Sequence, residues 1–174
     1  MKVIIDTSSL LSLVRYYLPF DKQNKLFEFV KNEFENGNLI IIDAVYQECE
    51  YISKGVVLKE LDYLKDKNFK KDYKIPLKTN DLIPPSTKKF YNLLNNNFRT
   101  PLSRRLNEAE FEERKKEFLD SADARIIISA LIKKSEKEDI VIITEETETG
   151  NDNKAFKKIP AICKILDIKV KTLP

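Results

Sequence analysis

Acidic side chains that follow short apolar segments are the residues of this sequence best placed to do chemistry. Asp6 comes directly after the apolar run of residues 3–5, and Glu146 comes shortly after the run of residues 140–143. Short β-branched runs of this kind are typical of buried parallel strands. Ligands of open parallel sheets bind beyond the carboxyl ends of the strands, so we expect both acids at a ligand-binding edge.

Two further acids are expected at the same edge, because each lies in a helix next to a predicted strand. Glu48 lies one to two turns into the helix after residues 39–42, and Asp123 lies near the start of the helix before residues 140–143. Carboxylates in one cleft repel each other unless a cation neutralises them, and Mg²⁺ or Mn²⁺ prefers such oxygen ligands. The four acids therefore predict metal-assisted cleavage of a phosphodiester.

The composition excludes several other chemistries. The chain has no histidine, so it can neither use a histidine-dependent triad nor build a histidine-ligated zinc site. Cys49 and Cys163 lack the spacing of zinc or redox sites, and we interpret both as buried apolar residues. The three glycines form no phosphate-binding loop. A phosphatase of the HAD-like type is disfavoured because Ser8 stands where that pattern has a second acid.

The elements that would position the acids alternate between strands and helices. Strands are predicted over residues 3–5, 39–42, 140–143 and 168–173. Helices are predicted directly after Asp6, over residues 21–36, after Asp43, over residues 107–118 and 121–134, and from Pro160. Strands joined by helical crossovers predict an α/β fold, a three-layer α/β/α sandwich with a mainly parallel central sheet of four to five strands.

One domain is predicted over residues 1–174, because a chain of this length can bury a self-sufficient core. Residues from about 59 to 106 interrupt the alternation with prolines and many Lys, Asp and Asn residues. We interpret this segment as a helical or loop insertion, or a lid, rather than a core element. The first apolar run is too short for a signal segment or a membrane span, so we expect a cytoplasmic protein without a membrane partner.

At the four acids the sequence resembles the PIN-domain family of metal-dependent nucleases. The strand and Asp-Thr-Asn-like turn of that family resemble residues 5–11, with Ser8 in the place of the more usual asparagine. Its glutamate in the next helix resembles Val45–Glu48, and its Ala-Asp-Ala segment resembles Ala122–Ala124. Its final strand and Thr-x-Asp resemble residues 143–146, with Glu146 in the place of the commoner aspartate. Residues 16–21, 144–146 and 158–163 look like a bacterial PIN-like branch of unassigned role.

The resemblance implies an endoribonuclease that uses Mg²⁺ or Mn²⁺, and the toxin of a toxin-antitoxin pair is one role that it suggests. Asp6, Glu48, Asp123 and Glu146 would be its catalytic and metal-binding residues, supported by Thr7, Ser8, Thr144 and Asp120. Single-stranded or tRNA-like RNA would be the substrate, and an antitoxin protein or a second copy of the chain would be a partner. Two alternatives stay open: a nuclease of DNA or flap structures, and a non-catalytic nucleic-acid-binding module.

Structural roles compete with catalytic ones at several of these positions. Asp6 could simply cap the following helix, and Asp43 fits a helix cap so well that we treat it as structural. Asp120 is the alternative to Asp123, since both lie near a helix start where acids are stabilised. We favour Glu48 over Glu50, which would point about 200° away on the helix. Of the last acidic pair, we expect Glu145 to be solvated.

Basic residues provide candidates for contacts with nucleic acid. Lysines outnumber acids between residues 65 and 89, and the interleaved Phe69 and Tyr73 could stack on bases, although a lysine-rich stretch is usually a solvated face. The net charge is only +3, so any attraction must be local. The candidates for phosphate contacts are Arg104, Arg105, Arg125, Lys70 and Lys71.

Overall fold

Four parallel strands form the centre of the molecule, as expected from the alternation of elements. The structure is a computed structural model that describes residues 1–148 and 154–174. The strands are β1 (Lys2–Ile5), β2 (Leu39–Ile40), β3 (Ile140–Ile143) and β4 (Lys169–Lys171), in the order β2-β1-β3-β4. All three strand pairings are parallel, so the carboxyl ends of β1 and β3 meet at one edge. The strand predicted at residues 168–173 is limited to Lys169–Lys171 in the structure.

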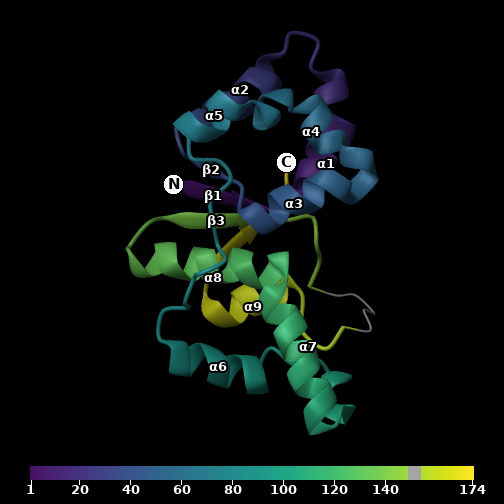
Figure 1. Cartoon of the computed structure of the whole chain (residues 1–174), viewed down its shortest axis with the longest axis vertical. Coiled ribbons are helices and arrows are strands. Elements are labelled where there is room, and N and C mark those ends of the chain that lie inside the picture. The colour runs from purple at the N-terminus through teal and green to yellow at the C-terminus, as the bar shows by residue number, and fades with distance from the viewer. Residues whose placement is uncertain (149–153) are drawn as a thin grey trace.

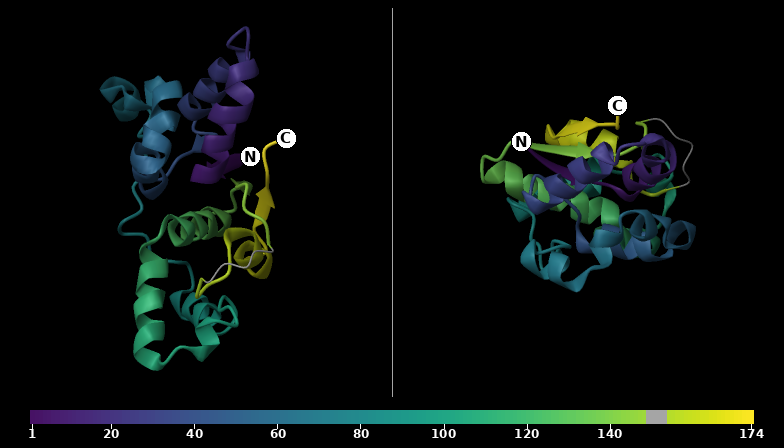
Figure 2. Two further views of the ribbon diagram at one scale, coloured as in Figure 1. Left: turned by 90° about the vertical axis from the view of Figure 1, so that its right-hand side faces the viewer. Right: turned by 90° about the horizontal axis from the view of Figure 1, so that it is seen from above.

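Helices cover both faces of the sheet and make the fold an α/β/α sandwich. Figure 1 shows one helical layer on each side of the strands, with α1 to α5 on one side and α8 and α9 on the other. The left view of Figure 2 shows the same separation. The first layer contains α1 (Thr7–Ser12), α2 (Lys25–Glu35), α3 (Asp43–Tyr51), α4 (Val56–Glu60) and α5 (Lys67–Asp72). The second half contributes α6 (Thr87–Asn96), α7 (Glu108–Asp120), α8 (Ala122–Ser135) and α9 (Ile159–Leu166).

Local sequence signals explain several helix boundaries. Asn107 and Glu110 form a reciprocal capping box at the start of α7. Ser121 ends α7 in an extended conformation and caps α8, so the two helices meet at one serine. The predicted helix at residues 21–36 begins only at Lys25, because Asn24 adopts a left-handed conformation and Asp21 accepts hydrogen bonds from the amides of Lys25 and Phe27.

The second predicted strand is shorter than the apolar run of residues 39–42. Only Leu39 and Ile40 pair with β1, because the chain then pairs with Leu77 of a distant segment. The Leu77 N–H donates to the Ile41 carbonyl at 2.9 Å, and the Asp43 N–H donates to the Leu77 carbonyl at 2.9 Å. This isolated bridge joins Leu77, which belongs to the predicted insertion, to the residues directly before α3.

The expectation that residues 59–106 lie outside the core is wrong. Leu61, Leu64, Leu94 and Phe98 are fully buried, and all four belong to the main hydrophobic cluster. Burial of such side chains contributes about 1.5–3 kcal/mol each, so the segment is a substantial part of the core. Its charged residues occupy the exposed faces between these apolar positions. No helix among the described residues is long and apolar enough to cross a membrane.

Candidate functional site

Asp6 is held in a fixed orientation at the carboxyl end of β1. It is the N-cap of α1, and its Oδ1 accepts from the Thr7 N–H at 2.7 Å. Its Oδ2 accepts from the hydroxyls of Ser8 at 2.6 Å and Thr144 at 2.8 Å. The residue is only 6% exposed. A carboxylate has about four lone-pair positions, and these three bonds leave one of them available to a ligand. Asp6 is therefore both a helix cap and an oriented ligand-binding group.

Glu48 lies across from Asp6 and is connected to it through Thr7. The Thr7 hydroxyl donates to Glu48 Oε2, while the Thr7 amide donates to Asp6. The pKa of Glu48 is raised because burial disfavours its charge and Asp6 repels it, although the Thr7 hydrogen bond opposes this. Glu50 is exposed on α3, whereas Glu48 is half-buried and hydrogen-bonded to Thr7.

Asp123 lies in the first turn of α8 and is half-buried, whereas Asp120 is exposed at the end of α7. The pKa of Asp123 is raised to about 6, mainly by burial and also by the charges of Glu146, Asp6 and Glu48, against the opposing charge of Lys154. The Asp123 carboxyl therefore senses all three other predicted ligands. The four acids belong to one electrostatic environment, although they come from four separate elements.

Glu146 and Glu145 have different surroundings in the loop after β3. The Glu146 N–H donates to Thr144 Oγ1 at 3.2 Å, and Glu146 Oε2 accepts from the Ile159 N–H at 3.4 Å. The expectation that Glu145 is solvated is wrong. Its Oε1 accepts from Ser9 Oγ at 3.1 Å and from the Leu173 N–H at 3.0 Å, so it connects α1 to the C-terminal residues.

The donor chemistry of these acids fits a hard divalent ion, but their spacing is wider than a closed metal site. Among residues 1–148 and 154–174, no three Asp, Glu or Cys side chains are close enough together to hold a metal ion. Carboxylates without a cation repel each other, and three of the four acids, Glu48, Asp123 and Glu146, are half-buried. Metal binding would require Glu48, Asp123 and Glu146 to converge on Asp6.

Asp43 and the two cysteines are buried structural residues, but Asp43 is not the helix cap that we expected: it is the first residue of α3, and Ile42 is the N-cap. Asp43 accepts from the amides of Ala44 and Thr79 and from the Thr79 hydroxyl. Burial alone would raise the pKa of Asp43, but these hydrogen bonds and the charge of Arg125 lower it below its ordinary value. Cys49 and Cys163 are fully buried free thiols whose pKa values are raised to about 12, mainly by burial.

The five predicted phosphate contacts are divided between two regions. Arg104 and Arg105 are exposed at the start of α7, which spans about 20 Å between them and Asp123. They are not brought to the acids. Arg125 lies one turn from the start of α8 and donates to Asn80 Oδ1 at 2.6 Å. Lys70 and Lys71 line a groove beside α3.

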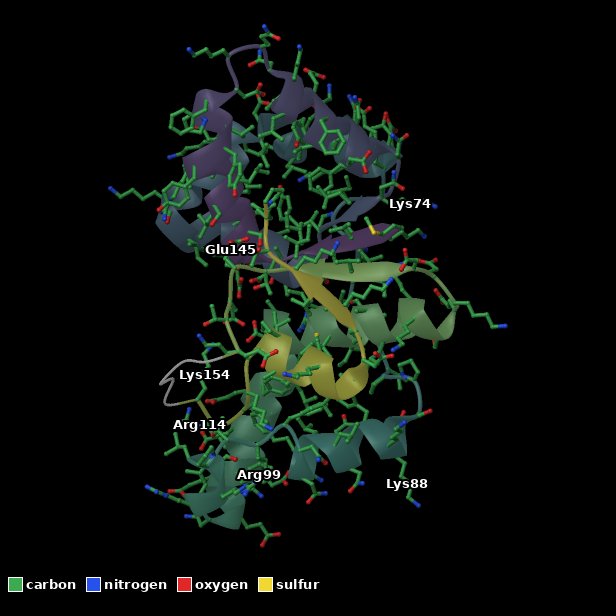
Figure 3. All side chains as sticks on the ribbon, turned by 180° about the vertical axis from the view of Figure 1, so that it is seen from behind. Lys74, Lys88, Arg99, Arg114, Glu145 and Lys154 are labelled. Carbon is green, nitrogen blue, oxygen red and sulfur yellow. The ribbon has the colours of Figure 1, made fainter. Side chains whose placement is uncertain are left out.

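Sequence reasoning missed Lys154, the cation next to the acids. A cavity of about 300 Å³ is lined by Asp123, Lys154, Lys157 and Arg114. Figure 3 shows Lys154 and Arg114 on the same side of the molecule as Glu145. Lys154 is eleven residues after Ile143, the end of β3, and has no motif around it, so no sequence signal connects it to Asp123. The polar loop predicted before α9 includes residues 149–153, which lie outside the described part of the chain.

Comparisons with known proteins identify a family without an assigned activity. A family model described as a domain of unknown function (DUF4411) matches residues 3–173, nearly the whole chain. No curated protein and no solved structure matches the chain.

Proposed function

We propose that this chain, which belongs to the DUF4411 family, is a divalent-metal-dependent hydrolase that cuts phosphodiesters of RNA. The observation that carries the proposal is the elevated pKa of Asp123, about 6, to which Glu146, Asp6 and Glu48 all contribute. The pKa values of Asp123 and Glu48 are both raised by burial and by the charges of neighbouring acids, so their ionised forms are costly to keep in this environment. A cation that binds them all would remove that cost, and such clusters are typical of catalytic sites.

The residues have separable roles in this proposal. Asp6, Glu48, Asp123 and Glu146 would hold the ion. Thr7 would fix Glu48 through its hydroxyl, and Ser8 and Thr144 would fix Asp6 through theirs. Bound Mg²⁺ or Mn²⁺ would neutralise charge on the phosphate and orient a water for attack. Lys154, whose charge acts on both Asp123 and Glu48, would attract the phosphate backbone.

RNA is favoured as the substrate by the resemblance of the four acidic motifs to PIN-domain nucleases. Asp6 follows β1, Glu48 lies in α3, Asp123 lies in α8 and Glu146 follows β3, and this order along the chain supports the proposal. An RNA substrate also fits the cytoplasm, which we propose as the location of the protein. An antitoxin protein or a second copy of the chain would be a partner on the same basis.

A second candidate is a non-catalytic module that binds nucleic acid. The observation that favours it is the spacing of the acids, since no described group of three is close enough together to hold a metal ion. Three hydrogen bonds also hold the Asp6 carboxylate without any ion. In this case the acids would be a remnant of an active fold, and the protein would bind RNA without cutting it.

A cleavage assay with matched variants separates the two candidates. Labelled single-stranded RNA, structured RNA and single-stranded DNA would be incubated with Mn²⁺ or with EDTA. We expect Mn²⁺-dependent cutting of RNA by the wild type and the controls Asp120→Asn and Glu50→Gln, and none by Asp6→Asn or Asp123→Asn. Asn caps helices as well as Asp, so Asp6→Asn keeps the fold. If the folded wild type cuts none of these substrates, the proposed hydrolase is refuted and the non-catalytic binding module is the remaining candidate.

A further inference from the structure

A groove lined by four lysines lies beside α3, outside the acidic site. Its volume is about 640 Å³, and its other walls are the start of α3 and the segment from Ile75 to Asn80. The cationic residues that line it are Lys70, Lys71, Lys74 and Lys78. We call this surface the lysine groove. The sequence placed these lysines in one charged run, but only the fold shows that they share one concave surface.

Among the residues that line the lysine groove, four are lysines and one, Asp43, is an acid, so the lining carries a net positive charge. Among the described residues, none of the four lysines forms an ion pair within 4.0 Å. Lys71, Lys74 and Lys78 are exposed, while Lys70 lies over the Tyr46 ring at 5.3 Å. The acid that lines the groove, Asp43, already binds Thr79 and Ala44 through hydrogen bonds. The groove therefore presents several free ammonium groups to a polyanion.

Two helices connect the lysine groove with the acidic site. The groove is lined by Asp43 and Gln47 of α3, the helix that also carries Glu48. Asn80, at the other end of the groove lining, accepts a hydrogen bond of 2.6 Å from Arg125 of α8. Asp123 is two residues before Arg125 on that helix. Figure 3 places Lys74 on the side opposite Glu145, so a ligand that reaches both regions must cross the width of the molecule.

One exposed aromatic ring favours single-stranded nucleic acid over a duplex as the ligand of this surface. Tyr73 lies between Lys71 and Lys74 in the chain and is 40% exposed, so its ring can stack on a base. Phe69, the other aromatic residue that we expected to stack on bases, cannot do so. It is buried, and its ring packs against the Tyr73 ring with 4.8 Å between the centroids. Bases in a duplex are already stacked and hide their faces. Tyr73 does not line the groove, so it would contact a base beside it. An aromatic ring next to a cationic groove is the arrangement that single-strand binders use.

We propose that the lysine groove binds the phosphates of single-stranded RNA on one side of the cut site, with Tyr73 stacked on a base. This inference rests on the proposed function for the cutting, but the binding itself needs neither metal nor catalysis. The lysines would hold the flanking strand, and the start of α8 would lead it to the acids. The predicted substrate is therefore an extended single strand that reaches several nucleotides beyond the cut.

Binding in EDTA tests the groove independently of cleavage. Fluorescence anisotropy would report binding of a labelled single-stranded RNA, and of a hairpin that contains the same sequence, over a range of salt concentrations. The test variant is Lys71→Gln/Lys74→Gln/Lys78→Gln, and the control is Lys65→Gln/Lys88→Gln/Lys89→Gln. Both variants lose three exposed charges, but the control lysines do not line the groove.

We expect the test variant to weaken single-strand binding about tenfold or more at low salt and to flatten the slope of log K against log salt by about 2. The control should match the wild type. Tyr73→Ala should weaken binding about fivefold or more, and Tyr91→Ala, which removes another exposed ring, should not. Equal losses in both triple variants, or tighter binding of the hairpin, would overturn the inference. Groove-dependent binding by a protein that never cuts RNA would support the groove while the proposed hydrolysis fails.

Discussion

Replacing Asp123 by Asn should stabilise the protein at neutral pH while it abolishes the proposed activity. The pKa of Asp123 is about 6 in the folded protein against an ordinary value of 3.8. Because the pKa is raised in the folded state, the neutral Asp123 carboxyl contributes to the free energy of unfolding. This contribution is complete below about pH 4 and is lost as the pH rises through about 6. The pKa difference corresponds to about 3 kcal/mol at pH 8 as an upper bound, because each pKa unit is worth 1.36 kcal/mol.

Part of this gain is offset at the helix start. Asp123 is the second residue of α8, where a negative charge contributes roughly 0.3–1 kcal/mol through the helix dipole. The net change for Asp123→Asn is therefore about 2 kcal/mol. In a chain of this size, that change raises the melting temperature by about 4–8 °C. Thermal unfolding in EDTA, followed by circular dichroism from pH 4 to pH 8, should show the two proteins diverge as pH rises.

The control for this experiment is Asp120→Asn, which removes an exposed acid three residues earlier. It should follow the wild-type profile between pH 5 and pH 8. Mn²⁺ should stabilise the wild type and the control at pH 7 but stabilise Asp123→Asn much less, since binding to the folded state alone raises stability. A constant difference between Asp123→Asn and the wild type at every pH would refute the buried, charge-coupled environment of Asp123.

Three further predictions test the surroundings of the site. Glu145→Ala should cost about 1–2 kcal/mol in urea unfolding, because Ser9 and the Leu173 amide lose their acceptor, whereas Glu148→Ala, which removes an exposed ion pair, should cost less than about 1 kcal/mol. Asp43→Ala should cost about 2–3 kcal/mol by the same assay because it strands buried Thr79 donors, and the exposed Asp72→Ala should change little. Both cysteine thiols should resist a disulfide-forming thiol reagent at pH 8 until urea unfolds the chain, since burial raises each pKa to about 12; rapid reaction in the native state would contradict this.

Local patterns were enough to predict the parallel sheet and its acid-bearing edge. The apolar run before Asp6 forms β1, and Asp6 caps α1 as its residue type favours. The same reasoning placed Asp123 in the first turn of α8 and Glu48 on the half-buried side of α3. These positions depend on neighbours along the chain, which is why the sequence alone could indicate them.

Contacts between distant residues account for the failures. β2 ends early because Leu77 pairs with the chain at Ile41 and Ile42, and no local pattern announces that pairing. Glu145 is held by Ser9 and Leu173, which are 136 and 28 residues away. The sequence predicted residues 59–106 to be a surface element because charged residues dominate the composition of this segment. Its apolar side chains nevertheless reach the core, since burial depends on which residues of a helix face inward.

Locating Mn²⁺ by anomalous X-ray scattering from crystals grown with the ion tests the central claim most directly. The ion should lie among the carboxylates of Asp6, Glu48, Asp123 and Glu146, with Glu48, Asp123 and Glu146 moved toward Asp6 from their present positions. No anomalous peak should remain there in the Asp6→Asn variant. A wild-type crystal with no peak among these acids, at an Mn²⁺ concentration that supports RNA cleavage, would contradict the proposed metal centre.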